Sequence, residues 1–255
     1  MAVFSSFPGL LWFLLMLVPL IALQRLLHRE IQAALYIASG GNARLTMAVF
    51  SILFFPGVAL HEFSHFIVAK LLFVRTRGFS IIPKMMPGGY LRMGYVEVAE
   101  TDIVRDSLIG AAPLILGNLA VASIAIYRLH LIPLWDVLRN GQMNLFWLGI
   151  TLLPTVPDFV LWFYLTFAIS STMLPSQSDR HAWLPLGLSV AVLFALALFA
   201  GAGSWMMLNL APPLNAFLQS VATLFGLSAA VHAVLIPPVM LLHKLLVRWL
   251  GWDIG

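Results

Sequence analysis

The strongest constraint on the fold is a series of apolar stretches, each long enough to form a helix across a membrane. A bilayer core of about 30 Å takes about 20 helical residues to cross. Of the 255 residues, 61% are hydrophobic and only 9% are charged, whereas about a quarter are charged in soluble domains. A water-soluble fold is therefore excluded. We place about six spans, at residues 7–23, 45–74, 108–127, 145–173, 184–208 and 217–246.

The predicted fold class is an all-α polytopic membrane protein with about six transmembrane helices, in a single domain over residues 1–255. No polar half separates from an apolar half, and no linker rich in Ser, Pro or Gly interrupts the chain. Pro154 and Pro157 are expected to kink the fourth span, which should stop at Pro175. Residues 24–39 alternate charged and apolar side chains, a pattern typical of an amphipathic helix on the membrane surface.

Residues 78–98 break the helical period with Pro and Gly among β-formers. They predict a short membrane-associated β-hairpin between the second and third spans, where protein or water must satisfy its backbone. The first 24 residues are apolar but lack a basic start and a small-residue cleavage site. They predict a retained helix rather than a signal peptide.

Basic residues set the expected orientation in the lipid bilayer. The net charge of +4 comes from Lys and Arg at the ends of apolar blocks, as in proteins that touch anionic headgroups. A nucleic-acid partner is therefore not expected. With six spans, nine of the 14 Lys and Arg residues fall on one face and five on the other. This asymmetry predicts a multi-pass plasma-membrane protein with both termini cytoplasmic.

The chemistry is concentrated in the second span, where His61, Glu62 and His65 form an HExxH pattern among apolar residues. Residues four apart lie on one face of a helix, so the two imidazoles can hold one Zn²⁺ ion. Glu62 is near enough to take a proton from a water on the metal. Chance would produce the letters in roughly one chain of this size in a hundred. A carboxylate in hydrocarbon is costly and functional by default, which favours a metal site.

A catalytic zinc usually has three protein ligands and an open position, so a third ligand is required. The chain has no cysteine, which leaves histidines and carboxylates. Asp158 and Asp179 are the main candidates, and His181 is close enough in sequence to Asp179 to support it. The acidic residues between 97 and 106 lie among other charges, where a solvated surface is the better interpretation.

Three motifs in order resemble the site-2 protease family of intramembrane zinc metalloproteases. HEFSHFIVAK at residues 61–70 looks like that family's motif helix, and PGGYLRM at 87–93 is similar to its membrane-associated β segment. SLIGAAPLILGN at 107–118 is similar to its AGPxxN element, with Ala112 in place of Gly and Asn118 later than the pattern. The resemblance covers residues 45–180.

The resemblance implies a third ligand from an Asp in a proline-containing unwound stretch. Both candidates follow imperfect copies of that stretch, and we favour Asp179, because a helix that ends at Pro175 leaves an irregular segment free to fold back toward the metal. Asp158 would then be a carboxylate beside the kink. The implied activity is regulated intramembrane proteolysis, with Glu62 as general base and a transmembrane protein as substrate. The hairpin offers a sheet edge for the unwound substrate strand.

Other interpretations stay open at this point. A prenyl-protein type of membrane peptidase also uses HExxH but needs a later third-ligand motif that this sequence lacks. A degenerate homologue would bind metal without proteolysis, although it would have no need of Glu62. An ion transporter would use the buried His and Asp residues as a path, but the two halves of the chain show no repeat symmetry.

Overall fold

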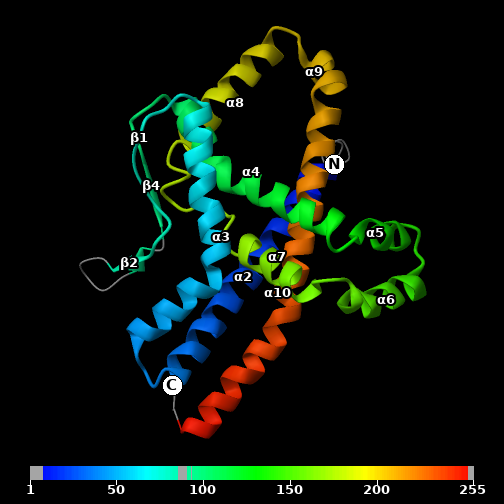
Figure 1. The fold of residues 1–255 in the computed structure, drawn as a ribbon. Helices are drawn as coiled ribbons and strands as arrows, with labels where there is room; N and C mark the ends of the chain where they lie inside the picture. Colours follow the sequence, from blue (N-terminus) through cyan, green and yellow to red (C-terminus); the bar gives the residue numbers. More distant parts are fainter. Residues whose placement is uncertain (1–7, 86–90, 93, 252–255) are drawn as a thin grey trace.

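Helices dominate the computed structural model, which describes residues 8–85, 91, 92 and 94–251. Within that part of the chain, the helices long and apolar enough to cross a membrane number four, or up to six if each of two bent helix pairs is one span. The predicted class, an all-α polytopic membrane protein, is confirmed at that level. The long helices are α2 (Pro8–Ala38), α3 (Ala43–Leu71), α4 (Ile103–Tyr127) and α10 (Ala211–Leu250) (Figure 1).

Two of the expected spans are broken. The fourth consists of α6 (Met143–Leu152), the 3₁₀ turn η1 (Leu153–Thr155) and α7 (Phe159–Ser170), which bend by 102°. The fifth consists of α8 (Trp183–Phe199) and α9 (Gly203–Asn209), which bend by 118°. Gly201 has φ 83° at this second bend, a conformation that glycine adopts without steric cost. The kink expected at Pro154 and Pro157 is therefore present. The bend at Gly201 was not predicted, because hydropathy does not register a change of direction inside an apolar run.

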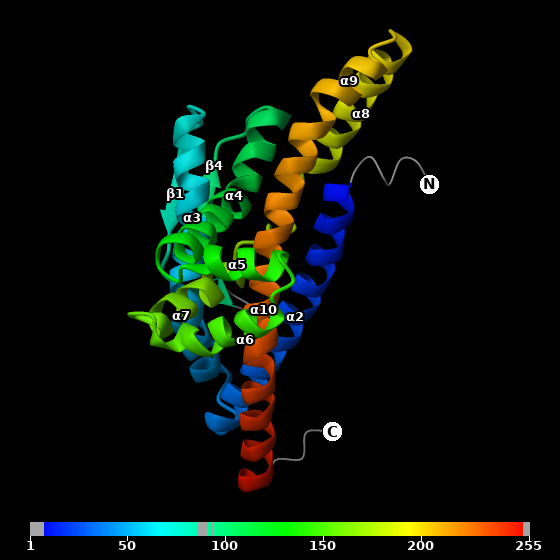
Figure 2. The ribbon, with the colours of Figure 1, turned by 90° about the vertical axis from the view of Figure 1, so that its right-hand side faces the viewer.

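A further short helix, α5 (Leu131–Arg139), precedes α6. The two lie at the edge of the bundle (Figure 1), and α8 and α9 project beyond the other helices (Figure 2). Along α8 no residue is buried, and its large apolar side chains are exposed. Such a surface is suited to contact with lipid rather than with water.

The prediction that residues 24–39 form a separate surface helix was also wrong. These residues continue α2 without a break to Ala38. Their apolar face is buried, with Leu27 and Ile37 both at 0% exposure, and Glu30 bonds His243 of α10 at 2.7 Å. The amphipathic pattern therefore reflects packing between two helices. The same pattern in sequence is typical of a surface helix, so it cannot distinguish the two cases.

Helices α2 and α10 run in parallel (Figure 1). The backbone N–H of Gly9 donates to Asn215 near the start of both helices, and Glu30 meets His243 near the end of both. Pro8 and Leu250 therefore lie at opposite ends of the pair. This course does not support the prediction that both termini share the cytoplasmic side. That prediction rested on six crossings, whereas the described residues allow four to six.

The expected hairpin is present between α3 and α4. Strands β1 (Thr76–Ser80) and β4 (Tyr95–Val98) pair antiparallel, as do β2 (Lys84–Met85) and β3 (Leu91–Arg92). The β1–β4 pair lies alongside α3 (Figure 1). Residues 87–90 and Met93 of the expected β motif lie outside the described residues.

The main core joins four helices around aromatic and aliphatic side chains. Phe54 of α3 packs between Phe50 and Phe167, at ring distances of 4.5 and 5.3 Å, and Leu27 of α2 and Val231 of α10 belong to the same cluster. Gly57 allows α3 to approach α7 closely, because a Cβ atom there would collide with the carbonyl of Ala168. This close contact lies one helical turn before His61 and fixes the motif helix against α7.

Candidate metal centre

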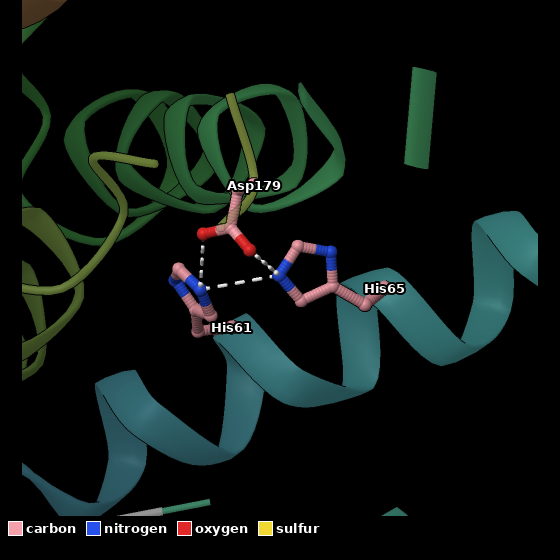
Figure 3. Close-up of side chains that lie close together, drawn as sticks. All are labelled: His61, His65 and Asp179. Carbon is pink, nitrogen blue, oxygen red and sulfur yellow. Dashed lines mark hydrogen bonds and ion pairs between the residues drawn. The ribbon is translucent and has the colours of Figure 1, made fainter. Parts of the chain in front are cut away.

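His61 and His65 project from one face of α3, one turn apart (Figure 3). The helix begins at Asn42, whose side chain accepts hydrogen bonds from the N–H groups of Arg44 and Leu45. It continues through the motif without interruption. The two Nε2 atoms are 3.2 Å apart, so the predicted pairing of the two imidazoles is present.

Backbone carbonyls orient both rings. The Nδ1 of His61 lies 2.7 Å from the carbonyl oxygen of Thr172, and the Nδ1 of His65 lies 2.8 Å from that of Ile109. A carbonyl oxygen only accepts, so each Nδ1 carries the proton and donates. In the neutral ring, the lone pair is then on Nε2. Metal-ligating histidines are commonly held in this way by the N–H that faces away from the metal.

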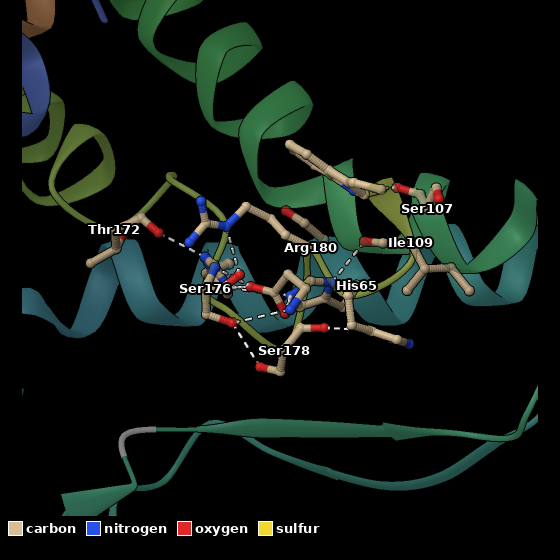
Figure 4. Close-up of polar contacts among 12 residues, drawn as sticks. His65, Ser107, Ile109, Thr172, Ser176, Ser178 and Arg180 are labelled. Atoms are coloured by element: carbon tan, nitrogen blue, oxygen red, sulfur yellow. Dashed lines mark hydrogen bonds and ion pairs between the residues drawn. The ribbon is translucent and has the colours of Figure 1, made fainter. Parts of the chain in front are cut away.

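Asp179 completes the group from an irregular segment, residues 171–182, between α7 and α8 (Figure 3). Its carboxylate oxygens lie 3.5 Å from the Nε2 of His61 and 3.3 Å from the Nε2 of His65. The backbone N–H of Ser176 donates to Oδ2 at 2.7 Å, within a set of polar contacts that shape the segment (Figure 4). α7 ends at Ser170, earlier than the end expected at Pro175, and the chain then folds back so that Asp179 reaches both histidines.

The contacts of the Asp179 carboxyl group favour its charged form. Burial raises its pKa, but hydrogen bonds with His61, His65 and Ser176 outweigh burial and hold the pKa well below its usual range. A bound cation would take the place of the protons between these three side chains. Since protons and metal compete for the same lone pairs, metal affinity should fall as the pH falls.

The spacing of the three ligand atoms fits a tetrahedral ion. Ligands at about 2.0 to 2.1 Å from a tetrahedral zinc lie about 3.3 to 3.4 Å from one another. The observed separations are 3.2, 3.3 and 3.5 Å. The side chains of the three residues are only 9 to 15% exposed. Three electron-pair donors held this close in a shielded place could hold a metal ion.

Glu62 lies beside this group, half-buried on α3, and its side chain rests on the hairpin. A Cβ atom built on Gly94 would come within 2.6 Å of the Cγ of Glu62 and 3.1 Å of its Oε1. Gly94 directly precedes β4. The absence of a side chain at residue 94 therefore leaves room for Glu62 between α3 and the sheet.

Asp158 is not part of the metal group. It is exposed, at the bend between η1 and α7, with φ 56° and no side-chain capping bond. His181 is not bonded to Asp179. Its Nε2 pairs with Asp106 of α4 at 2.7 Å, and its Nδ1 donates to the carbonyl oxygen of Ser178 at 2.6 Å. Asn118 donates to the carbonyl of Leu114 within α4.

Sequence reasoning missed the groups that hold the Asp179 segment against α4. The Asp106 carboxylate accepts the bond from His181, and the Ser107 hydroxyl donates to the carbonyl of Ala182 at 3.2 Å. Gly110 provides the close approach, because a Cβ atom there would collide with the carbonyl of Asp179. Asp106 looked like a solvated surface residue.

The fold and the site together describe a helical polytopic membrane protein with a candidate metal centre at His61, His65 and Asp179. No family model matches the chain, and neither the curated proteins nor the solved structures contain a significant match.

Proposed function

We propose that the protein is an intramembrane zinc metalloprotease, similar to the site-2 protease family, that hydrolyses peptide bonds of transmembrane proteins in the plasma membrane. The observation that carries the proposal is the near-tetrahedral spacing of His61, His65 and Asp179, with Glu62 next to His61 on the same helix. A structural metal site needs no adjacent carboxylate, and structural zinc sites are closed by four protein ligands. Three ligands leave a position open, as in catalytic zinc sites.

Zinc is the ion that this ligand set favours. Two imidazoles and one carboxylate suit Zn²⁺, whereas Mg²⁺ and Ca²⁺ prefer oxygen ligands. When bound, the ion lowers the pKa of a coordinated water to about 7 and polarises the scissile carbonyl. The roles of the chain are then to hold the ion and to move the proton. Glu62 accepts the proton from the attacking water and returns it to the leaving amine.

The hairpin supports a substrate bound as a strand. Glu62 rests on Gly94, so the start of β4 borders the group that would act as the base. The β1–β4 sheet has two strands, and an unwound transmembrane segment can add to such an edge through main-chain hydrogen bonds. This mode places few demands on side chains, so we expect low sequence specificity.

Metal removal tests the proposal directly. The protein purified in detergent should contain one zinc per chain, measured by elemental mass spectrometry. It should cleave a membrane-tethered reporter, lose that activity on chelation and regain it with Zn²⁺. Zinc bound without any cleavage would favour a non-proteolytic metal-binding protein or an ion transporter. A wild-type protein free of metal after growth in zinc would contradict the metal centre itself.

Gly94→Ala tests the position of Glu62. The added methyl would lie 2.6 Å from the Cγ of Glu62, closer than carbon atoms can pack, so the carboxylate must shift. Misplacement by about 1 Å can cost about 100-fold in rate, and cleavage should fall by about that factor. Zinc content should stay at the wild-type level, because residue 94 touches no ligand in the described part of the chain.

Gly78→Ala is the matched control. A Cβ atom at residue 78, in β1 of the same sheet, would meet only side-chain atoms of Tyr95 and Glu97, at 3.2 and 3.3 Å. These side chains can give way, so cleavage should stay within about twofold of wild type. Equal activity of the two variants would show that Gly94 does not set the position of Glu62.

A further inference from the structure

His232 is a polar residue in a wholly buried place on α10, with 0% exposure. Its Nδ1 lies 2.7 Å from the carbonyl oxygen of Ser228, to which it must donate. The neutral ring therefore presents a lone pair at Nε2, which accepts the hydroxyl proton of Ser171 at 2.9 Å. Both ring nitrogens are satisfied, and the hydrogen bond to Ser171 links α10 to the end of α7.

Ser171 is held from a second side by α2. The side-chain amide of Gln24 donates to the backbone carbonyl of Ser171. Ser171 is itself only 2% exposed and lies directly after the last residue of α7. Side chains from α2 and α10, helices that carry none of the candidate ligands, thus hold the backbone carbonyl and the hydroxyl of this one residue.

The next residue, Thr172, reaches the metal group. Its carbonyl oxygen accepts the proton from the Nδ1 of His61 at 2.7 Å, and its hydroxyl donates back to Ala168 at 3.1 Å. Because Ser171 and Thr172 are consecutive, a shift of the first moves the carbonyl of the second. The orientation of the His61 ring then changes, and with it the direction of the Nε2 lone pair.

We propose that His232 and Gln24 are positioning residues for the metal centre, because they clamp Ser171 and so hold the Thr172 carbonyl that orients His61. The inference rests on the metal centre proposed above. It gives α2 and α10 a part in metal binding, although neither helix supplies a ligand.

His232→Leu removes the hydrogen bond to Ser171 and should weaken zinc binding about tenfold, at the lower end of what outer partners of metal-ligating histidines contribute. Zinc affinity would be measured by competition with a chromophoric chelator. The visible spectrum of the Co²⁺-loaded protein should also change, since it reports ligand geometry. His232→Gln keeps a hydrogen-bond acceptor near the position of Nε2. Its zinc affinity and Co²⁺ spectrum should therefore be close to those of wild type.

His243→Leu is the matched control on the same helix. His243 bonds Glu30 of α2 at 2.7 Å and makes no hydrogen bond to Ser171 or Thr172. Its loss should lower the melting temperature of the metal-free protein but leave zinc affinity and the Co²⁺ spectrum unchanged. Ser171→Ala is a smaller change that also removes the hydrogen bond between Ser171 and His232. It should weaken zinc binding as His232→Leu does, and it replaces His232→Leu as the test if His232→Leu does not fold.

The proposal is overturned if His232→Leu and Ser171→Ala bind zinc as tightly as wild type, with an unchanged Co²⁺ spectrum, while their melting temperatures fall as in His243→Leu. The buried histidine would then only join helices. A wild-type protein that binds neither zinc nor Co²⁺ would overturn the metal centre, and this inference with it. Unchanged zinc binding in the two variants would leave the proposed metal centre intact. Failure of this inference is therefore distinguishable from failure of the metal centre.

Discussion

Glu62→Gln is expected to lower cleavage of a membrane-tethered reporter by about 10²- to 10⁴-fold, the range that a positioned general base contributes, while zinc content stays at the wild-type level. The amide has nearly the shape of the carboxylate, so the packing against Gly94 should persist. It cannot accept the proton of the attacking water. Product formation would be followed by gel electrophoresis, with zinc measured on the same sample.

Ser64→Ala provides the matched control for Glu62→Gln. Ser64 lies two residues further along α3, is fully buried, and donates its hydroxyl to the carbonyl of Leu60 within the helix. Its replacement disturbs the same helix without touching the ligands, so cleavage should stay near wild type. Undiminished cleavage by Glu62→Gln would remove Glu62 from the mechanism. Loss of zinc in that variant would instead mean that the carboxylate helps to bind the ion.

The sequence was sufficient to predict the histidine pair because helical periodicity converts a spacing of four residues directly into a shared face. His61 and His65 therefore needed only a continuous helix, and α3 provides one. Asp179 was predictable to a lesser degree. Pro175 indicated an irregular segment after the fourth span, although α7 already ends at Ser170. Two carboxylates satisfied the same sequence pattern, and the packing of residues 171–182 against α4 distinguishes them.

The groups that orient the ligands were beyond sequence reasoning. Thr172 and Ile109 act through backbone carbonyls, which every residue carries, so residue identity gives no signal. The course of α8 and α9 was missed for a related reason. An apolar run has the same hydropathy whether it crosses a membrane or reverses inside it, and the bend at Gly201 depends on one backbone conformation.

The α2–α10 pairing illustrates a third limit. An amphipathic pattern in residues 24–39 records that one face is apolar, not what covers that face. In the structure another helix covers it, and the Glu30 carboxylate accepts hydrogen bonds from His243 and Arg29, at 2.7 and 3.0 Å. Glu30 and His243 lie more than 200 residues apart in the sequence. Local sequence patterns cannot predict a contact over such a separation.

The third ligand gives the second large expected effect. Asp179→Ala should reduce zinc affinity by more than about 100-fold, because the loss of a ligand should exceed the 10- to 100-fold cost of losing an outer partner. Two imidazoles alone rarely hold a catalytic zinc. The variant purified in detergent should contain little zinc and should not cleave the reporter. Its melting temperature without metal should stay near that of the metal-free wild type.

Asp179→Asn and Asp158→Asn form the matched pair, because both remove one negative charge and keep the side-chain shape. Asn also tolerates the positive φ of 56° at residue 158, where Ala would be strained. Asp158 is exposed and does not belong to the ligand group, so Asp158→Asn should bind zinc like wild type. Asp179→Asn should bind it weakly, since a neutral amide oxygen is a poorer ligand. The reverse result, with zinc lost from Asp158→Asn and kept by Asp179→Asn, would mean that the segment after α7 does not supply the ligand and that the bend at Asp158 must reach the histidines instead.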